Sequence, residues 1–205
     1  MRKLLAIAFL TLLPLTAVLA EPIPLKELAS GKPVSAVDKS GGRVGVIYIA
    51  ARPELVWQTV SNWQRLAEIL PAVAGGKLMW QAKDKRSAVV EGNFEIENFG
   101  AQFSLYVKSD PARLRQEWRM LTDDEVSGFL AKNILVHFNS GLLAKMQGYQ
   151  IVWPYGDGCL YYYAPTVSST IALPEYTKAA IDSGTYLEHL RLVKKSIEEA
   201  QAVRR

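Results

Sequence analysis

The stretch ARPELVWQTVSNWQRLAEILPAV, residues 51–73, decides the fold class because it stands between two kinds of strand pattern. Before it, RVGVIYIA (43–50) is apolar on both faces, as a covered strand is. Inside it, apolar residues recur at helical spacing and include Trp57 and Trp63. The Ser-Asn pair at 61–62 can end one helix and cap another, so we predict two short helices instead of one.

After residue 75 the apolar period changes to two, which is typical of strands with one dry face and one wet face. Four such strands are predicted, over 76–82, 87–97, 101–108 and 113–121. Two hairpins flank them, over 33–51 and 148–168, with glycine-containing turns at 39–42 and 156–158. Gln116 is the one polar side chain on the dry face of its strand.

Two further segments complete the prediction. An apolar stripe after the Leu-Pro pair at 173–174 predicts a long helix over 175–200. Gly184 lies within the stripe and either permits a close approach to the sheet or kinks the helix. The apolar spacing of residues 125–147 fits a helical insertion, whereas their β-branched run 134–136 fits a strand with a loop, and both alternatives stay open.

This order of elements predicts an α+β fold in which a curved antiparallel β-sheet wraps around a long C-terminal α-helix. One helix cannot fill a strongly curved sheet, so we expect an apolar cavity between them, closed at one end by the short helices. The alternative for each helical tryptophan taken alone is ordinary core packing, and for Gln116 a sheet end that touches solvent. We expect the cavity walls to include Trp57, Trp63, Trp80, Phe94, Phe103, Gln116, Trp118, Tyr149, Trp153 and Leu187.

The N-terminus has the pattern of a cleaved Sec-type signal peptide. Arg2 and Lys3 precede an apolar run over 4–15, and small or modest residues end at Ala20, where we expect cleavage. The alternative is a retained anchor, but the run is short for a span of ~20 residues and Pro14 interrupts it. We therefore expect a soluble periplasmic protein. The predicted units are the signal (1–20), a lead-in with the first hairpin arm (21–42), one domain (43–200) and a tail (201–205).

The charge balance gives no indication of the strongly basic surface that a nucleic-acid-binding protein needs. Removal of Arg2 and Lys3 lowers the formal net charge from +4 to +2. Basic residues near the C-terminus can touch anionic lipid, although a solvated helix face explains them as well; they are at 191, 194, 195, 204 and 205. We expect a monomer that makes at most a transient membrane-surface contact.

The sequence assigns no catalytic residue, metal or cofactor. Cys159 is the one cysteine, so it forms no intramolecular disulfide, and we expect it to be a small buried apolar residue. One cysteine and two histidines, His137 and His189, exclude a zinc site of the Cys/His type. No Gly-x-Ser-x-Gly motif, P-loop or dinucleotide fingerprint occurs. For each histidine, the simplest interpretation is that it lies on the surface or is a hydrogen-bonded residue of the core.

Several segments resemble the START-like helix-grip superfamily, within it the polyketide cyclase/dehydrase and coenzyme Q-binding branch. AARPELVW (50–57) is similar to the A-x-x-x-V-W that follows a strand end in that branch. SNWQRLAEILP (61–71) resembles D-Y-x-x-L-x-x-x-x-P, with Asn62 in place of Asp and Trp63 in place of Tyr. The hairpin 148–158 resembles G-x-W-x-L-x-P-x-G-D-G-T, with departures at 149 and 152, and the Leu-Pro pair before the last helix is similar too.

The resemblance covers about residues 43–200 and implies a pocket for an apolar or amphipathic molecule. Our leading hypothesis is an exported carrier or sensor of a lipid-like or quinone-like molecule. A cyclase or aromatase that uses the same pocket is the second. A structural or interaction protein, whose cavity is filled by its own side chains, is the third. The same fold hosts transporters, cyclases and hydrolases, so the resemblance does not choose among ligands.

Overall fold

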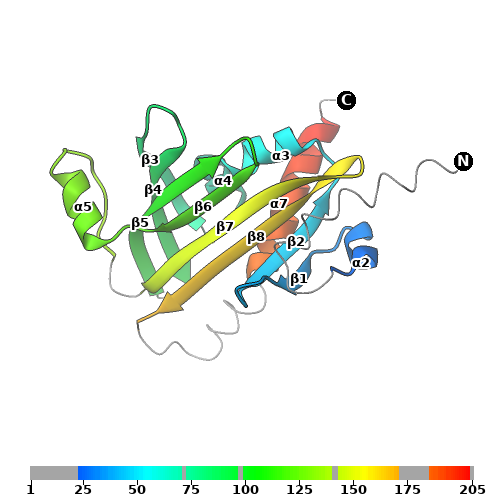
Figure 1. Ribbon diagram of the computed structural model, residues 1–205, viewed down its shortest axis with the longest axis horizontal. Helices are drawn as coiled ribbons and strands as arrows, with labels where there is room; N and C mark the ends of the chain where they lie inside the picture. Colours follow the sequence, from blue (N-terminus) through cyan, green and yellow to red (C-terminus); the bar gives the residue numbers. More distant parts are fainter. Residues whose placement is uncertain (1–22, 71–72, 97–98, 140–142, 171–184, 204–205) are drawn as a thin grey trace, which may run out of the picture.

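The computed structural model describes residues 23–70, 73–96, 99–139, 143–170 and 185–203. These form an eight-stranded antiparallel sheet in the order β1-β2-β8-β7-β6-β5-β4-β3, with helices on both faces (Figure 1). The strands are β1 (Val34–Val37), β2 (Arg43–Ile49), β3 (Val73–Gln81), β4 (Ser87–Ile96), β5 (Phe99–Asp110), β6 (Arg115–Met120), β7 (Leu143–Tyr155) and β8 (Gly158–Ser169). The helices are α2 (Leu25–Ala29), α3 (Pro53–Val60), α4 (Trp63–Ile69), α5 (Asp123–Leu130) and α7 (Thr185–Ala202).

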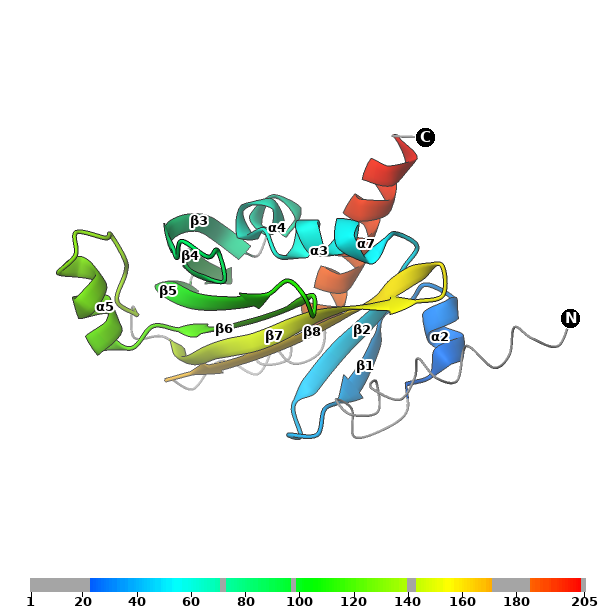
Figure 2. The ribbon, with the colours of Figure 1, turned by 45° about the horizontal axis from the view of Figure 1, so that its top comes forward.

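The curved antiparallel sheet, the two short helices and the C-terminal helix are confirmed. The helices α3, α4 and α7 lie together on one face of the sheet, which we call the inner face (Figure 2). The opposite face, the outer face, is covered by α2 near β2 and β8 and by α5 near β4 and β5. The inner face therefore has the larger helical cover, and the described core is centred there.

The break between α3 and α4 follows the predicted chemistry. Pro53 stands in the first turn of α3, where its missing N–H costs nothing. Asn62 caps α4 by accepting a hydrogen bond at its side-chain oxygen from the Arg65 N–H, 3.2 Å away. The chain can therefore turn between the two helices and keep both against the inner face.

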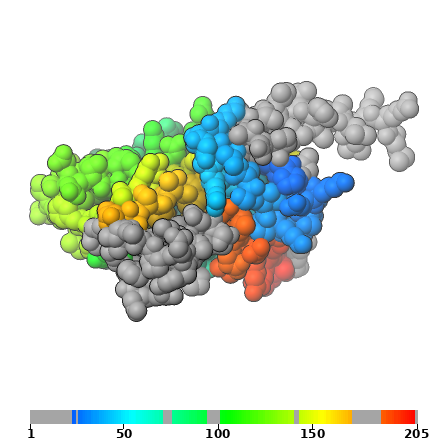
Figure 3. All heavy atoms as spheres, turned by 90° about the horizontal axis from the view of Figure 1, so that it is seen from below, coloured from blue at the N-terminus to red at the C-terminus, as the bar shows by residue number. Residues whose placement is uncertain are grey.

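A glycine in β2 lets α7 lie close to the sheet. A Cβ atom on Gly45 would stand 2.7 Å from Leu190 Cδ1 and 2.9 Å from Tyr186 Cδ2, both on α7. Leu190 is fully buried at this contact. Figure 3 shows α7, orange to red, directly against the blue segment that contains β1 and β2.

Some sequence predictions fall outside the described residues. These are the signal peptide, the Leu-Pro pair at 173–174, Gly184 and the part of the long helix before Thr185. In the described part, a glycine on the strand β2, Gly45, permits a close approach of the helix to the sheet.

Two segments differ from the prediction or decide between its alternatives. The lead-in contains a short helix, α2, whose Leu28 is buried against the outer face. The described part of the ambiguous region 125–147 is helical only at its start, and the β-branched run 134–136, which suggested a strand, lies in neither a helix nor a strand. It contains the helix α5, with a capping box between Thr122 and Glu125, and it then joins β7 at Leu143. No helix in the described part of the chain is both long enough and apolar enough to cross a bilayer.

Substitution of Gly45 tests the close contact of α7 with β2. Gly45→Ala places a methyl group where Leu190 and Tyr186 already lie, and we expect a loss of about 1–3 kcal/mol in the free energy of unfolding. Chemical denaturation measures it. Gly128→Ala, at a helical site with no atom within 4 Å of the added Cβ, is the control and should be neutral or slightly stabilising. Equal stability of Gly45→Ala and wild type would contradict the contact.

Candidate functional site

A pocket of about 320 Å³ lies on the inner face, between the α3–α4 junction and strands β3 to β6. Apolar and polar side chains contribute about equally to its lining, and the apolar part includes Trp57, Trp63, Leu78, Val90 and Val107. The polar part comes from the helix junction, the exposed end of β3 with its turn, and the buried end of the pocket: Ser61, Asn62, Gln64, Gln81, Lys85, Ser109 and Gln116. Its volume lies within the range of about 300–1,000 Å³ that small-molecule sites occupy.

Six of the ten predicted wall residues lie on the inner face. Three of them, Trp57, Trp63 and Gln116, line the pocket itself. The other three pack in the core on this face: Phe103, Trp118 and Leu187. Trp57 is also part of the core that joins α3 to α7, so core packing and pocket lining coincide in this residue.

Trp80 lies on the outer face, so the prediction for its side was wrong. The register of β3 against β4 shifts between Leu78 and Trp80, which places Leu78 opposite Val90 but Trp80 opposite Val89. Such an irregularity breaks the alternation of faces along the strand. Trp80 therefore packs against Phe129 of α5, and the centroids of the two rings are 5.5 Å apart.

Two predicted residues on β7 also lie on the outer face, which corrects their assignment to the cavity. The Tyr149 hydroxyl donates a hydrogen bond to Asp38 Oδ2 over 3.1 Å, beneath the β1–β2 turn. Trp153 packs with the α2 cluster. Gln150 and Val152 occupy the inner face of this strand instead, because the side chains alternate. The tenth residue, Phe94, has its side chain outside the described part of the structure.

A chain of buried hydrogen bonds crosses the inner face from β5 to α7. Gln116 Nε2 donates to Ser109 Oγ over 2.9 Å. Gln150 Nε2 donates both to Gln116 Oε1 over 2.7 Å and to the Val60 carbonyl over 2.8 Å. The Tyr161 hydroxyl donates to Gln150 Oε1 over 2.7 Å. Because a buried polar group without a partner is costly, this chain fixes the strands and α3 relative to one another.

His189 on α7 completes the chain. Its Nε2 lies 3.3 Å from the Tyr161 hydroxyl oxygen. The one hydroxyl proton of Tyr161 is given to Gln150, so His189 Nε2 must carry the hydrogen and donate it to Tyr161. The imidazole also stacks on the Tyr163 ring, with centroids 3.9 Å apart. This histidine is thus a hydrogen-bonded core residue, one of the two simple interpretations of its sequence position.

Aromatic rings continue from His189 toward the pocket. Tyr163 stacks on Trp118 at 5.6 Å, and Trp118 meets Trp63 edge to face at 5.5 Å. The indole Nε1 atoms of Trp63 and Trp118 are buried, and no acceptor for them lies among the described residues. Trp63 therefore joins the pocket wall to an aromatic layer that reaches α7.

Burial keeps the titratable groups of this face uncharged. Burial lowers the pKa of His189 from 6.5 to about 3, because the imidazolium ion would lose its hydration there. Burial also raises the pKa of Tyr161 well above 10. On the neighbouring strand end, burial raises the pKa of the Cys159 thiol to about 12, and the residue is fully buried as predicted. The inner face is therefore a neutral hydrogen-bonding surface near pH 7.

The sequence analysis missed two central members of the chain. Gln150 shares the inner-face parity of Val152, but the prediction had placed the opposite parity of β7, that of Tyr149 and Trp153, in the cavity. Tyr161 lies in the YYY run 161–163, where both parities are aromatic, so no pattern separates inner Tyr161 and Tyr163 from outer Tyr162. The detectable signal was a glutamine facing the same side as Gln116 on a neighbouring strand.

His137 lies on the outer face, away from this chain. Its Nε2 is 3.5 Å from Glu91 Oε1, and its backbone N–H donates to Ser104 Oγ. Within the described ranges, no three or more His, Cys, Asp or Glu residues gather as a metal site would require.

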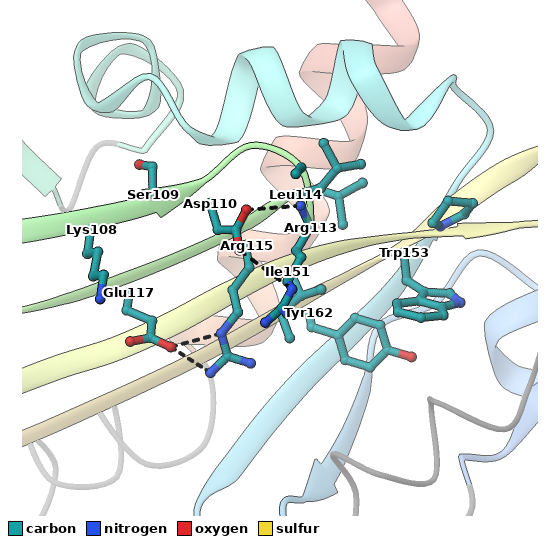
Figure 4. A pocket seen from close by; sticks show the side chains of 13 residues that line it. Lys108, Ser109, Asp110, Arg113, Leu114, Arg115, Glu117, Ile151, Trp153 and Tyr162 are labelled. Atoms are coloured by element: carbon teal, nitrogen blue, oxygen red, sulfur yellow. Dashed lines mark hydrogen bonds and ion pairs between the residues drawn. The ribbon is translucent and has the colours of Figure 1, made fainter. Parts of the chain in front are cut away.

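A larger hollow of about 760 Å³ lies on the outer face near the β5–β6 turn (Figure 4). Trp153 and Tyr162 lie at one end, and the Arg115–Glu117 ion pair, 2.8 Å long, lies nearer the other. Five of its thirteen lining residues are charged, and an apolar ligand that covered them would remove groups from water, although apolar atoms form more of its lining surface than polar atoms do. The inner-face pocket has one charged residue, Lys85, among the described residues that line it, and it lies beneath the helices α3 and α4, so we take it as the candidate site.

Comparison with solved structures identifies the architecture. A START superfamily protein from Mycobacterium smegmatis superposes with a TM-score of 0.58 and 17% identity, over 77% of this chain and 97% of that chain. The chain has the START-like, helix-grip fold. A STAR-related lipid transfer protein fragment from Xanthomonas axonopodis gives a TM-score of 0.57 at 12% identity, over 81% and 98%. The Zhui aromatase/cyclase from Streptomyces sp. R1128 gives 0.56 at 15%, over 76% and 92%.

The resemblance in the helix-grip segments is thus confirmed at the level of the fold. No protein-family model matches the sequence, and no curated protein matches it. At identities this low the START-like similarity establishes the architecture, whereas the ligand must be argued from the site.

The buried state of His189 predicts a pH dependence of stability. Its folded pKa of about 3 lies below the ordinary 6.5, so the unfolded chain binds the extra proton first. The contribution of neutral His189 to the free energy of unfolding is fully present above pH 6.5 and is lost as the pH falls toward 3. Between pH 7 and pH 5 we expect a loss of about 2 kcal/mol in unfolding free energy, measured by denaturant titration.

His189→Phe keeps the ring on Tyr163 and should remove most of this slope between pH 7 and pH 5, although it lowers stability at pH 7. His137→Gln, at the other histidine, should keep the slope. A His189→Phe protein with an unchanged slope would show that the imidazole is not held neutral by burial.

Proposed function

We propose that the chain binds and carries a hydrophobic small molecule, lipid-like or quinone-like, in the inner-face pocket. The observation that carries this proposal is the pocket between α3–α4 and the sheet, with Trp57 and Trp63 in its wall and Gln116 at its buried end. A START-like fold shared with a STAR-related lipid transfer protein supports a ligand of this general kind. Burial of about 400 Å² of apolar ligand surface would contribute ~10 kcal/mol before the costs of association.

Binding without chemistry is the simpler use of this site. The neutral His189 is not among the residues that line the pocket, and its pKa of about 3 makes it a poor base near pH 7. A cyclase or aromatase reaction is the second candidate, and the fold shared with an aromatase/cyclase is the observation in its favour. That candidate requires a product distinct from the bound molecule.

The proposal includes export and a periplasmic location, from the signal pattern that ends at Ala20. N-terminal sequencing of protein recovered from the periplasm should find Glu21 as its first residue. Recovery of the uncleaved chain in the membrane fraction would contradict cleavage, and its recovery in the cytoplasm would contradict export. A transient contact with a membrane surface belongs to the same proposal, because a carrier must exchange its ligand.

Filling the pocket tests the proposed function. Ala88→Trp introduces a large ring into the wall formed by β4, and we expect it to weaken binding of a fluorescent fatty acid or quinone at least ten-fold. Ala131→Trp adds the same ring at an exposed site after α5 and should leave affinity unchanged. Displacement titration measures both, and mass spectrometry of an organic extract identifies any molecule that co-purifies. No co-purified hydrophobe and no probe binding by the wild type would overturn the proposal.

A further inference from the structure

One charged side chain stands in the lining of the inner-face pocket. Among the described residues that line it, Lys85 alone is ionisable. Lys85 is exposed, whereas Gln116 at the other end is 2% exposed, so the charge lies at the open end and the amide at the buried end. The pocket is therefore polarised from a cationic mouth to a neutral interior.

The β3–β4 turn fixes the position of this lysine. Ala82 N–H donates to the Ser87 carbonyl over 2.8 Å and closes the turn, and Lys85 N–H donates to the Ala82 carbonyl over 2.9 Å. Lys85 has φ +58, in the left-handed region that glycine and asparagine usually fill. The turn therefore fixes the backbone of Lys85 in a conformation that lysine does not itself favour, and the side chain starts from this point at the pocket lining.

The Lys85 ammonium group has no carboxylate partner among the described residues, whereas Lys194 is 2.7 Å from Glu198. The neighbouring acid of the turn, Asp84, instead accepts a hydrogen bond from the Arg86 N–H over 2.9 Å. An unpaired cation beside apolar walls complements a ligand that has one negative group on an apolar body.

We infer that the pocket binds an amphipathic anion with one acidic head group, its oxyanion at Lys85 and its apolar body against Trp57 and Trp63. This inference rests on the proposed function and narrows it from any hydrophobic molecule to an acidic one. A neutral quinone or alcohol would use the walls but leave the cation without a partner. A carboxylate and a phosphate monoester share the required head chemistry.

Paired ligands test the inference. Isothermal titration calorimetry at pH 8 and low ionic strength, below micellar concentrations, compares dodecanoate with dodecanol, which has the same chain without the charge. We expect dodecanoate to bind about five-fold more tightly, as one partly exposed charge pair gives. Lys85→Gln, which keeps the backbone demand unchanged, should abolish this preference and leave dodecanol binding as it was. Lys83→Gln, in the same turn but outside the pocket lining, should preserve it.

The outcomes separate the inference from the function on which it rests. Equal wild-type affinities for dodecanoate and dodecanol, or a preference that Lys85→Gln leaves intact, would overturn the anionic head and leave the hydrophobic carrier standing. Failure of both ligands to bind would overturn both. Dodecyl phosphate, which should also lose affinity in Lys85→Gln, distinguishes the two head groups by its strength relative to dodecanoate.

Discussion

The inner face depends on the hydrogen bonds of one buried glutamine. The Gln150 side chain is 1% exposed, and its amide bonds to the α3 backbone, to Gln116 on β6 and to Tyr161 on β8. Tyr161 extends the contact to His189 on α7. A displaced helix or strand would leave a buried polar group unpaired, so these bonds specify a single arrangement of helices on the sheet, which apolar packing alone would not. The pocket begins where this chain ends, at Gln116.

Space on this face is set by glycines as much as by large side chains. Gly92 stands opposite Phe103, and a Cβ there would lie 2.2 Å from the phenylalanine ring. The absence of a side chain at Gly76 lets β3 lie against the Trp63 carbonyl of α4. Gly45 likewise lets β2 lie against Leu190 and Tyr186 of α7. The contacts at Gly76 and Gly45 thus let α4 and α7 lie close to the sheet, and the inner-face pocket described here lies at the α3–α4 junction.

Local chemistry was the part of the fold that the sequence could predict. The Pro53 start, the Asn62 cap and the period-two strands depend on neighbouring residues, and all were found as expected. Three of the ten expected wall residues line the pocket, because a regular alternation placed Gln116 and a helical spacing placed Trp57 and Trp63. What failed depends on pairing between strands. The register shift in β3 moved the Trp80 side chain to the outer face. The three consecutive tyrosines gave no alternation of apolar and polar residues from which their faces could be predicted. The position of Lys85 at the pocket mouth depends on the geometry of the β3–β4 turn, which the local sequence pattern did not predict.

The central claim is that ligands bind on the inner face, at the α3–α4 junction. The five tryptophans report on this directly, because two line the pocket and two others, Trp80 and Trp153, lie on the outer face. The most direct measurement is the indole N–H spectrum of ¹⁵N-labelled protein during titration with dodecanol. The account predicts shifts at Trp57 and Trp63 with Trp80 and Trp153 unmoved. Shifts confined to Trp80 or Trp153 would contradict it.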